Sequence, residues 1–343
     1  MKKVVLLIGV LLLLTGLGLR TLWSWWHSPL PDQAAVIITI EEGSSLSAVA
    51  SRLSRQGVLR WPELWTQLAR LQELDQQIHK GEYALAADMS PGQILEALVQ
   101  GRVVQYSVTL PEGITLSAAL SILQQQDAVK VLLDGSSDPR LLELVSPQSQ
   151  AEGLFFPDTY VFSRGETDLG ILKQAHRRMQ SVLSSAWRTR DAGLPYQSAY
   201  EALIMASIVE KETGLASERE QIAGVFVRRL GKSMRLQTDP TIIYGLGEDY
   251  QGNLRRRHLE DSANPYNTYR HKGLPPSPIA LPGADAIHAA LNPAAGSTLY
   301  FVARGDGSHQ FSDTLEEHQR AVRQYQLKRR KDYRSAPPSG DDS

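Results

Sequence analysis

The stretch Ala202-Leu-Ile-Met-Ala-Ser-Ile-Val-Glu-Lys-Glu212 begins with a strongly apolar run. Its first eight residues carry a single polar side chain, Ser207, and two glutamates arrive just before Thr213-Gly214. Good helix formers followed by a glycine predict a helix that ends there, and a helix that is apolar on every face is normally buried. We therefore expect a buried helix with two carboxyl groups at its C-terminal end.

Glu210 is the catalytic candidate in this stretch. It lies seven residues after Leu203 and three after Ser207, which places it on the buried stripe of the helix. A carboxyl among apolar groups, near the negative end of a helix dipole, should have a raised pKa and suits a general acid. Glu212 points about 200° away around the helix, so we expect that both cannot enter one cleft. The residues alone leave open that both are solvated at a fraying helix end.

Composition restricts the class of protein. With 343 residues the chain is long enough for two or more domains. A net charge of −1 argues against nucleic acid as the main partner. The absence of cysteine excludes disulfides and thiolate metal sites, and the histidines lack the spacing of metal motifs. We therefore expect neither a metal nor another cofactor.

The N-terminal sequence predicts a membrane anchor. Met1-Lys2-Lys3 precedes a charge-free apolar segment from Val4 to Leu19. Sixteen helical residues span about 24 Å, short of a hydrocarbon core of roughly 30 Å, but Arg20 can snorkel and the following tryptophans can sit at the interface. By the positive-inside rule, residues 1–28 form a cytoplasmic stub and single-pass signal-anchor, with the remainder in the periplasm. A cleaved signal peptide is the alternative, although no A-x-A-like site is present.

A pattern of strand, glycine turn and capped helix occurs twice. After a linker at 29–35, Val36 to Ala50 shows it first, and Tyr106 to Leu120 repeats it. Tyr83 to Leu95 likewise resembles Tyr160 to Leu172. We interpret this as two strand–helix–strand–helix units, at 36–104 and 105–165, with chance similarity as the alternative. The identical pairs in the first match are Thr39/Thr109, Glu42/Glu112, Gly43/Gly113, Leu46/Leu116, Ser47/Ser117 and Ala48/Ala118.

The remaining residues, 166–330, form the predicted catalytic domain of an α+β protein. Leu236 to Asn292 is rich in proline, glycine, asparagine and tyrosine, which favours long ordered loops that line a site. Leu299 to Ala303 predicts a strand and Leu315 to Lys331 a polar helix. Residues 331–343 are too polar to pack and predict a disordered tail.

Several motifs, in one order between about Val36 and Arg329, resemble the endolytic murein transglycosylase (YceG-like) family. The motifs are Glu152-Gly-Leu-Phe-Phe-Pro-Asp-Thr-Tyr160, Ala206-Ser-Ile-Val-Glu-Lys-Glu-Thr213, Arg235-Leu-Gln-Thr-Asp-Pro-Thr-Ile-Ile-Tyr-Gly245, Tyr266-Asn-Thr-Tyr269 and Gly273-Leu-Pro-Pro-Ser-Pro-Ile279. The resemblance implies a LysM-like peptidoglycan-binding module at 36–104. It also implies a carbon–oxygen lyase of the inner membrane that cleaves the MurNAc-GlcNAc β-1,4 bond within glycan strands and leaves 1,6-anhydro-MurNAc ends. Termination of nascent strands, and penicillin-binding proteins and other wall-synthesis proteins as partners, are implied in the same way.

The resemblance assigns the catalytic role to Glu210. Such an enzyme needs only one acidic side chain, which first protonates the bridging oxygen and then accepts a proton from the sugar's own hydroxyl. Two alternatives stay open: a muramidase that uses Glu210, Asp239 and water, and a scaffold protein that binds peptidoglycan without cleaving it.

Substrate contacts are expected from the loops. Pro240 restricts Asp239 to an extended conformation, which can aim neighbouring amide and hydroxyl groups at a sugar; the alternative is that Asp239 only caps a helix. Tyrosine rings can stack on sugars while polar atoms orient them, and a purely structural loop is the alternative there. The expected substrate-binding residues are Ser207, Gln237, Thr238, Asp239, Tyr244, Tyr266, Asn267 and Tyr269.

Overall fold

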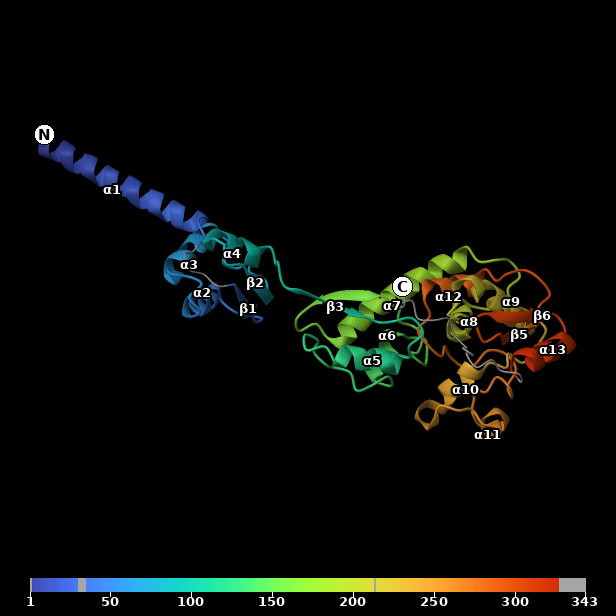
Figure 1. Ribbon diagram of the computed structural model, residues 1–343. Helices are drawn as coiled ribbons and strands as arrows, with labels where there is room; N and C mark the ends of the chain where they lie inside the picture. The colour runs from blue at the N-terminus through green and yellow to red at the C-terminus, as the bar shows by residue number, and fades with distance from the viewer. Residues whose placement is uncertain (1, 30–34, 213, 327–343) are drawn as a thin grey trace. The chain divides into compact units, whose positions relative to one another are not determined.

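The computed structural model describes residues 2–29, 35–212 and 214–326. It divides into two compact units, residues 1–106 with 161–166, and residues 107–160 with 167–343 (Figure 1). Most of the predicted linker at 29–35 and all of the predicted tail at 331–343 lie outside the described residues. Each unit is described by itself below.

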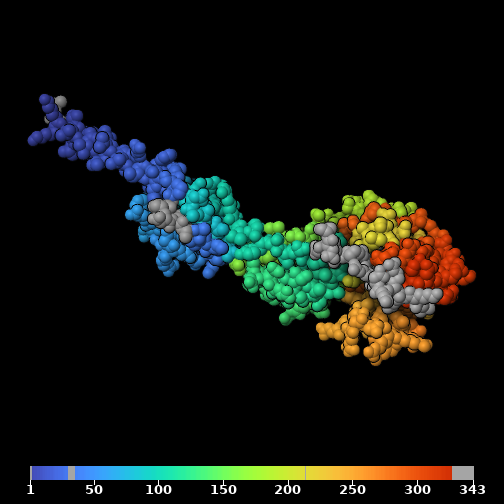
Figure 2. Space-filling model, in the orientation of Figure 1, coloured from blue at the N-terminus to red at the C-terminus, as the bar shows by residue number. Residues whose placement is uncertain are grey.

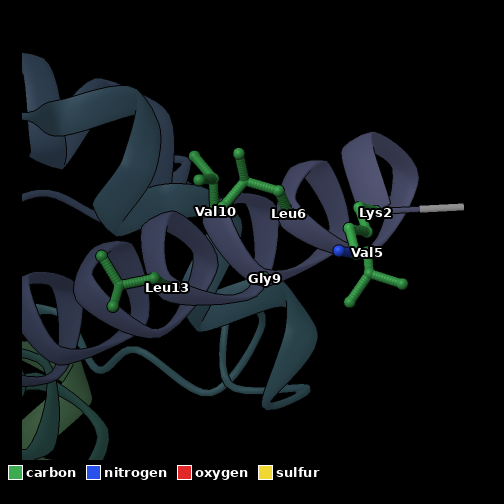
Figure 3. A pocket seen from close by; sticks show the side chains of 6 residues that line it. All are labelled: Lys2, Val5, Leu6, Gly9, Val10 and Leu13. Carbon is green, nitrogen blue, oxygen red and sulfur yellow. The ribbon is translucent and has the colours of Figure 1, made fainter.

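The first element of the first unit is α1, Lys2–His27. An 18-residue window of this helix has a mean hydropathy of 2.2, and the helix is long enough to cross a membrane. Figure 3 shows Val5, Leu6, Val10 and Leu13 projecting from the ribbon beside Gly9, where they line a shallow hollow. The helix is compatible with a single-pass anchor, and a signal sequence would meet the same two criteria.

The rest of the first unit is built on an antiparallel pair of strands, β1 (Val36–Ile40) and β2 (Gly81–Leu85), in which Val36 pairs with Leu85. Ser45 and Ser90 cap the helices that follow these strands, as predicted. One more helix lies between the two strands along the chain, and it was not predicted. The three helices are α2 (Leu46–Arg55), α3 (Pro62–Leu71) and α4 (Pro91–Val99). Their core includes Ile38, Leu53, Trp65, Tyr83 and Ile94.

The same order of elements recurs after residue 104. Strands β3 (Gln105–Thr109) and β4 (Thr159–Ser163) pair in a second two-stranded sheet. Thr115 and Thr167 cap the helices that follow them, so the strands and capped helices predicted from the repeat are present. Here too an unpredicted helix stands between the strands. The helices are α5 (Leu116–Gln124), α6 (Pro139–Leu144) and α7 (Asp168–Arg188).

The C-terminal domain is organised around α8, Ala199–Glu212, which packs against α7, α9, α10 and α12 (Figure 1). Every residue from Ala202 to Val209 is at most 4% exposed, which confirms the predicted buried helix. Around it lie α9 (Arg219–Gly231), α10 (Asp239–Leu246), α11 (Arg256–Glu260) and α12 (Ala284–Leu291), with short 3₁₀ turns at Ala216–Glu218 and Gly247–Asp249.

The prediction of long ordered loops from Leu236 to Asn292 was wrong in part. Helices α10, α11 and α12 occupy much of this region. Pro240 lies in the first turn of α10 and Gly283 precedes α12, so residues that suggested loops instead delimit short helices.

The chain then forms a hairpin, of whose two strands only the first was predicted. Strands β5 (Tyr300–Ala303) and β6 (His309–Ser312) are antiparallel, and Ala303 pairs with His309. Gly305 and Gly307 have φ values of 89° and 93° in the connecting turn, a conformation that glycine adopts without strain. Helix α13, Leu315–Tyr325, follows and packs against both strands.

Candidate active site

A cavity of about 890 Å³ lies at the C-terminal end of α8. The end of α8, the segment before α10, strand β5 and helix α13 all contribute side chains to its wall. In Figure 2 yellow residues, from the part of the chain around α8 and α9, lie at the surface beside the red residues of the last described segment. The cavity is large enough for a small-molecule or sugar ligand.

Glu210 is a buried carboxyl on the wall of this cavity, with a side chain that is 7% exposed. Its Oε2 accepts a 2.9 Å hydrogen bond from the backbone N–H of Gly283, and Nη2 of Arg219 lies 3.9 Å from its Oε1. Burial raises the pKa of Glu210, and the negative charge of Glu112 raises it further; Gly283, Arg219 and Lys211 act against this rise. The expected rise in pKa is therefore present, and burial is its main cause.

Glu212 lines the same cavity as Glu210. Burial raises the pKa of Glu212 to about 7, although the Thr238 hydroxyl donates a hydrogen bond to its Oε1. The expectation that the two glutamates could not enter one cleft was wrong. The cavity surrounds the end of α8 rather than one face, so it reaches side chains that point in different directions.

Four of the expected substrate-binding residues lie together on the cavity wall: Gln237, Thr238, Asp239 and Tyr269. The Tyr269 hydroxyl donates a 2.8 Å hydrogen bond to Asp239 Oδ1, and the Thr238 amide donates to the Thr268 hydroxyl at 3.0 Å. These bonds fasten the segment before α10 to the loop that contains Tyr269. Asp239 is the first residue of α10 and Thr238 is the N-cap residue, so the capping alternative for Asp239 was wrong.

Ser207 and Asn267 are buried away from the cavity and are both 0% exposed. The Ser207 hydroxyl donates to the Ile204 carbonyl at 2.7 Å and accepts from the Ile279 amide at 3.0 Å. The Asn267 side-chain amide donates to main-chain carbonyls, including that of Asp261 at 2.6 Å. Their polar groups hold loops in place, and we do not propose them as sugar contacts.

Tyr244 and Tyr266 belong to a second buried cluster. Their ring centroids lie 4.9 Å apart. The Tyr244 hydroxyl donates to Glu152 Oε2 at 3.2 Å, and the Tyr266 hydroxyl donates to the Gln150 side chain at 2.9 Å. Glu152 also accepts from the Leu116 amide at 2.9 Å, and burial raises the pKa of Glu152 to about 7. The cluster joins distant parts of the domain and lies outside the wall of the large cavity.

Sequence reasoning missed several side chains of the cavity wall, notably Arg219, Arg229, Tyr300 and His318. The Arg229 guanidinium lies 5.0 Å from the Tyr300 ring centroid and donates to the Leu236 carbonyl at 2.8 Å. Burial lowers the pKa of His318, which favours its neutral form. These residues come from three separate elements, α9, β5 and α13, so no local motif could have identified them. Among the described residues, no group of three or more potential metal ligands is present.

The fold and the cavity define a mixed α/β domain that presents a protonatable glutamate to a ligand-sized site. Over residues 38–324 the chain matches the model of the YceG-like family, and the chain belongs to that family. This confirms the resemblance noted in the sequence.

Named relatives and a solved structure support the same family. An endolytic murein transglycosylase of Bacillus subtilis is 30% identical over 86% of this chain and 86% of its own length. One from Streptococcus pneumoniae is 28% identical over 84% of this chain, which spans 58% of that relative. The crystal structure of a putative YceG-like protein from Listeria monocytogenes matches 84% of this chain and 99% of its own, with 29% identity and a TM-score of 0.53.

Proposed function

We propose that this chain is an endolytic murein transglycosylase. It cleaves the β-1,4 bond between MurNAc and GlcNAc within glycan strands and leaves 1,6-anhydro-MurNAc ends. The names of the bacillary and streptococcal relatives support this activity. In this chain the proposal rests on one observation: the Glu210 carboxyl is buried, its pKa is raised, and it lies on the wall of the 890 Å³ cavity.

The reaction needs one proton carrier and no water. Protonated Glu210 donates its proton to the bridging oxygen, and the bond from that oxygen to MurNAc C1 breaks. The C6 hydroxyl of the same MurNAc then attacks C1, and the Glu210 carboxylate accepts the hydroxyl proton. Glu210 is therefore protonated again at the end of the cycle. Because the attacking hydroxyl is already part of the substrate, its proximity to C1 supplies much of the rate. The raised pKa keeps the proton available for the first step.

The remaining cavity residues are proposed to bind the glycan. Gln237, Thr238, Asp239 and Tyr269 line the wall beside the two glutamates. The Tyr269 ring offers a stacking surface, and the amide and hydroxyl groups offer hydrogen bonds to N-acetyl and sugar hydroxyl groups. Bonds between the two loops hold these groups in place before substrate arrives.

The N-terminal part is proposed to bring the enzyme to its substrate. We propose that α1 spans the inner membrane with Lys2 and Lys3 in the cytoplasm, so that the catalytic domain lies in the periplasm. The 36–104 module is proposed to bind peptidoglycan as a LysM-like domain. This arrangement suits an enzyme that ends nascent glycan strands beside penicillin-binding proteins and other synthases.

A hydrolytic muramidase is the second candidate function. The observation that favours it is that Glu212 and Asp239 line the same cavity as Glu210, so a further carboxylate is present that could activate water. The products discriminate between the two activities, because an anhydro end is lighter than a reducing end by one water molecule. A non-catalytic scaffold would bind isolated sacculi without releasing fragments.

The test compares the full-length chain with Glu210→Gln and Glu212→Gln on purified glycan strands. Glutamine keeps the shape of each side chain but cannot transfer a proton. Glu143→Gln, on the exposed surface of α6, is the matched control. We expect Glu210→Gln alone to abolish the release of anhydro-ended fragments. Full activity of Glu210→Gln with loss in Glu212→Gln would move the catalytic role to Glu212.

A further inference from the structure

The two copies of the repeated motif use the same Glu-Gly turn in different surroundings. Gly43 and Gly113 have φ values of 79° and 74°, so both turns have the same left-handed glycine. In the first copy the turn faces solvent: Glu42 is exposed and pairs with Lys80 at 2.7 Å. No atom lies within 4 Å of a Cβ placed on Gly43.

In the second copy the turn is fastened beside Glu210. The Gly113 amide donates to the Leu281 carbonyl, and the Leu281 amide donates to the Ile114 carbonyl, each at 2.8 Å. The Lys211 ammonium donates to the Gly113 carbonyl at 2.9 Å. A Cβ placed on Gly113 would lie 3.6 Å from Cγ of Glu210. The second turn therefore packs directly against the proposed catalytic side chain.

The Glu112 carboxyl lies against Gly283, the residue that holds Glu210. A Cβ placed on Gly283 would overlap the Glu112 carboxyl group. The N–H of the same glycine donates to Glu210 Oε2 at 2.9 Å. Two carboxyl groups therefore flank one glycine, and only the Glu210 carboxyl is on the cavity wall.

We propose that Glu112 is a positioning residue of the acid site: its carboxylate beside Gly283 keeps Glu210 in the protonated form that the first step of cleavage requires. The inference rests on the proposed function. According to this proposal, the second copy of the repeat has a role in the active site that the first copy does not have.

The charges around Glu210 support this role. Glu112 raises the pKa of Glu210, whereas Arg219 and Lys211 lower it. Both cations have other partners: Nη1 of Arg219 bonds Asp285 of α12 at 3.0 Å, and Lys211 bonds the Gly113 carbonyl. Glu112 thus offsets cations that would otherwise favour the ionised carboxylate. Removing its charge should lower the pKa of Glu210.

A direct titration tests the coupling without relying on activity. The full-length chain, labelled with ¹³C at glutamate carboxyl carbons, is titrated by NMR as wild type, Glu112→Gln and Glu42→Gln, with Glu210→Gln to assign the signal. Glu42→Gln is the matched control, because it changes the same motif in the first copy. We expect the Glu210 midpoint to move to lower pH in Glu112→Gln and to stay in Glu42→Gln. An unchanged midpoint in Glu112→Gln would overturn the proposal.

A second variant displaces the charge instead of removing it. Gly283→Ala retains the N–H that bonds Glu210, and Gly283 has a φ of −77°, which alanine adopts freely. The added methyl must push the Glu112 carboxyl away, so the Glu210 midpoint should again move to lower pH. A midpoint that is unchanged in both variants refutes the role of Glu112 even if one of them is poorly folded.

Activity separates this inference from the proposed function. Loss of the Glu112 charge should move the alkaline limb of the pH–rate profile to lower pH, while Glu112→Asp should restore it. A uniform loss at every pH would indicate a merely structural role and would contradict the proposal. If Glu210→Gln still releases anhydro ends, the proposed function fails, whereas the NMR midpoints still decide whether Glu112 acts on Glu210.

Discussion

The backbone N–H of Gly283 donates a 2.9 Å hydrogen bond to Oε2 of Glu210. Arg219 lies 3.9 Å from the other oxygen, Oε1. Burial favours the protonated form of Glu210, but each carboxylate oxygen already has a partner that stabilises the charged form. This combination suits a group that must give up a proton and then take one back, because neither form is strongly trapped.

Substitutions at Arg219 and at its partner Asp285 should change the pKa of Glu210. Arg219→Gln removes a positive charge and should raise the pKa of Glu210, which moves the pH profile of kcat/KM to higher pH. Asp285→Asn removes the partner of Arg219 and should move the profile the other way, because the positive charge is then less neutralised. The measurement is the initial rate of fragment release as a function of pH. Shifts of the same sign in both variants would contradict this account.

Tyr269 and Tyr244 should behave differently, since only Tyr269 lies on the cavity wall. Tyr269→Ala removes a stacking surface and should raise KM for glycan strands by about 3- to 10-fold. Tyr244→Phe should leave KM unchanged and lower stability by about 1 kcal/mol, because it loses the hydrogen bond to Glu152. Steady-state kinetics and thermal unfolding report the two effects. A raised KM in Tyr244→Phe would indicate that Tyr244 contacts the substrate after all.

Glu212 should make the protein less stable as the pH rises. Its pKa is about 7 in the folded chain against an ordinary glutamate pKa of 4.5, so the folded state binds an extra proton between these two pH values. The contribution of Glu212 to the free energy of unfolding is therefore fully present below pH 4.5 and is lost as the pH rises through 7. Glu212→Gln cannot ionise and should reduce the loss of unfolding free energy between pH 5 and pH 8 by about 1–3 kcal/mol.

Chemical unfolding at these two pH values, with Glu143→Gln as the control, checks this prediction. Glu152 should contribute in the same direction, because burial also raises its pKa to about 7. A pH dependence in Glu212→Gln equal to that of the wild type would show that Glu212 already ionises freely in the folded chain.

Local sequence patterns predicted much of the fold. Capped helices were predicted after the strands of the repeat, and Ser45, Ser90 and Thr167 cap three of these helices. The buried α8 followed from its uninterrupted apolar residues. Helices α3 and α6 were not predicted, because the repeat was read from its matching strands and capped helices alone.

The site was harder to predict from sequence than the fold. Glu210 was identified by its position at the end of a buried helix, but Glu112 and Gly283 lie far from it along the chain, and Arg219 belongs to the next α-helix. The interpretation of Ser207 and Asn267 as sugar contacts relied on their polar groups and their place in a motif. Burial of those groups against main-chain carbonyls and amides is a tertiary property that no local pattern encodes.

The mass of the released glycan ends shows whether this chain cleaves as a transglycosylase or as a hydrolase. The full-length wild-type chain and Glu210→Gln are incubated with purified glycan strands, and the products are analysed by mass spectrometry. We expect internal fragments with 1,6-anhydro-MurNAc ends from the wild type, and a loss of at least about 100-fold in their release by Glu210→Gln. Reducing ends from the wild type, or undiminished release of anhydro ends by Glu210→Gln, would contradict the proposed role of Glu210.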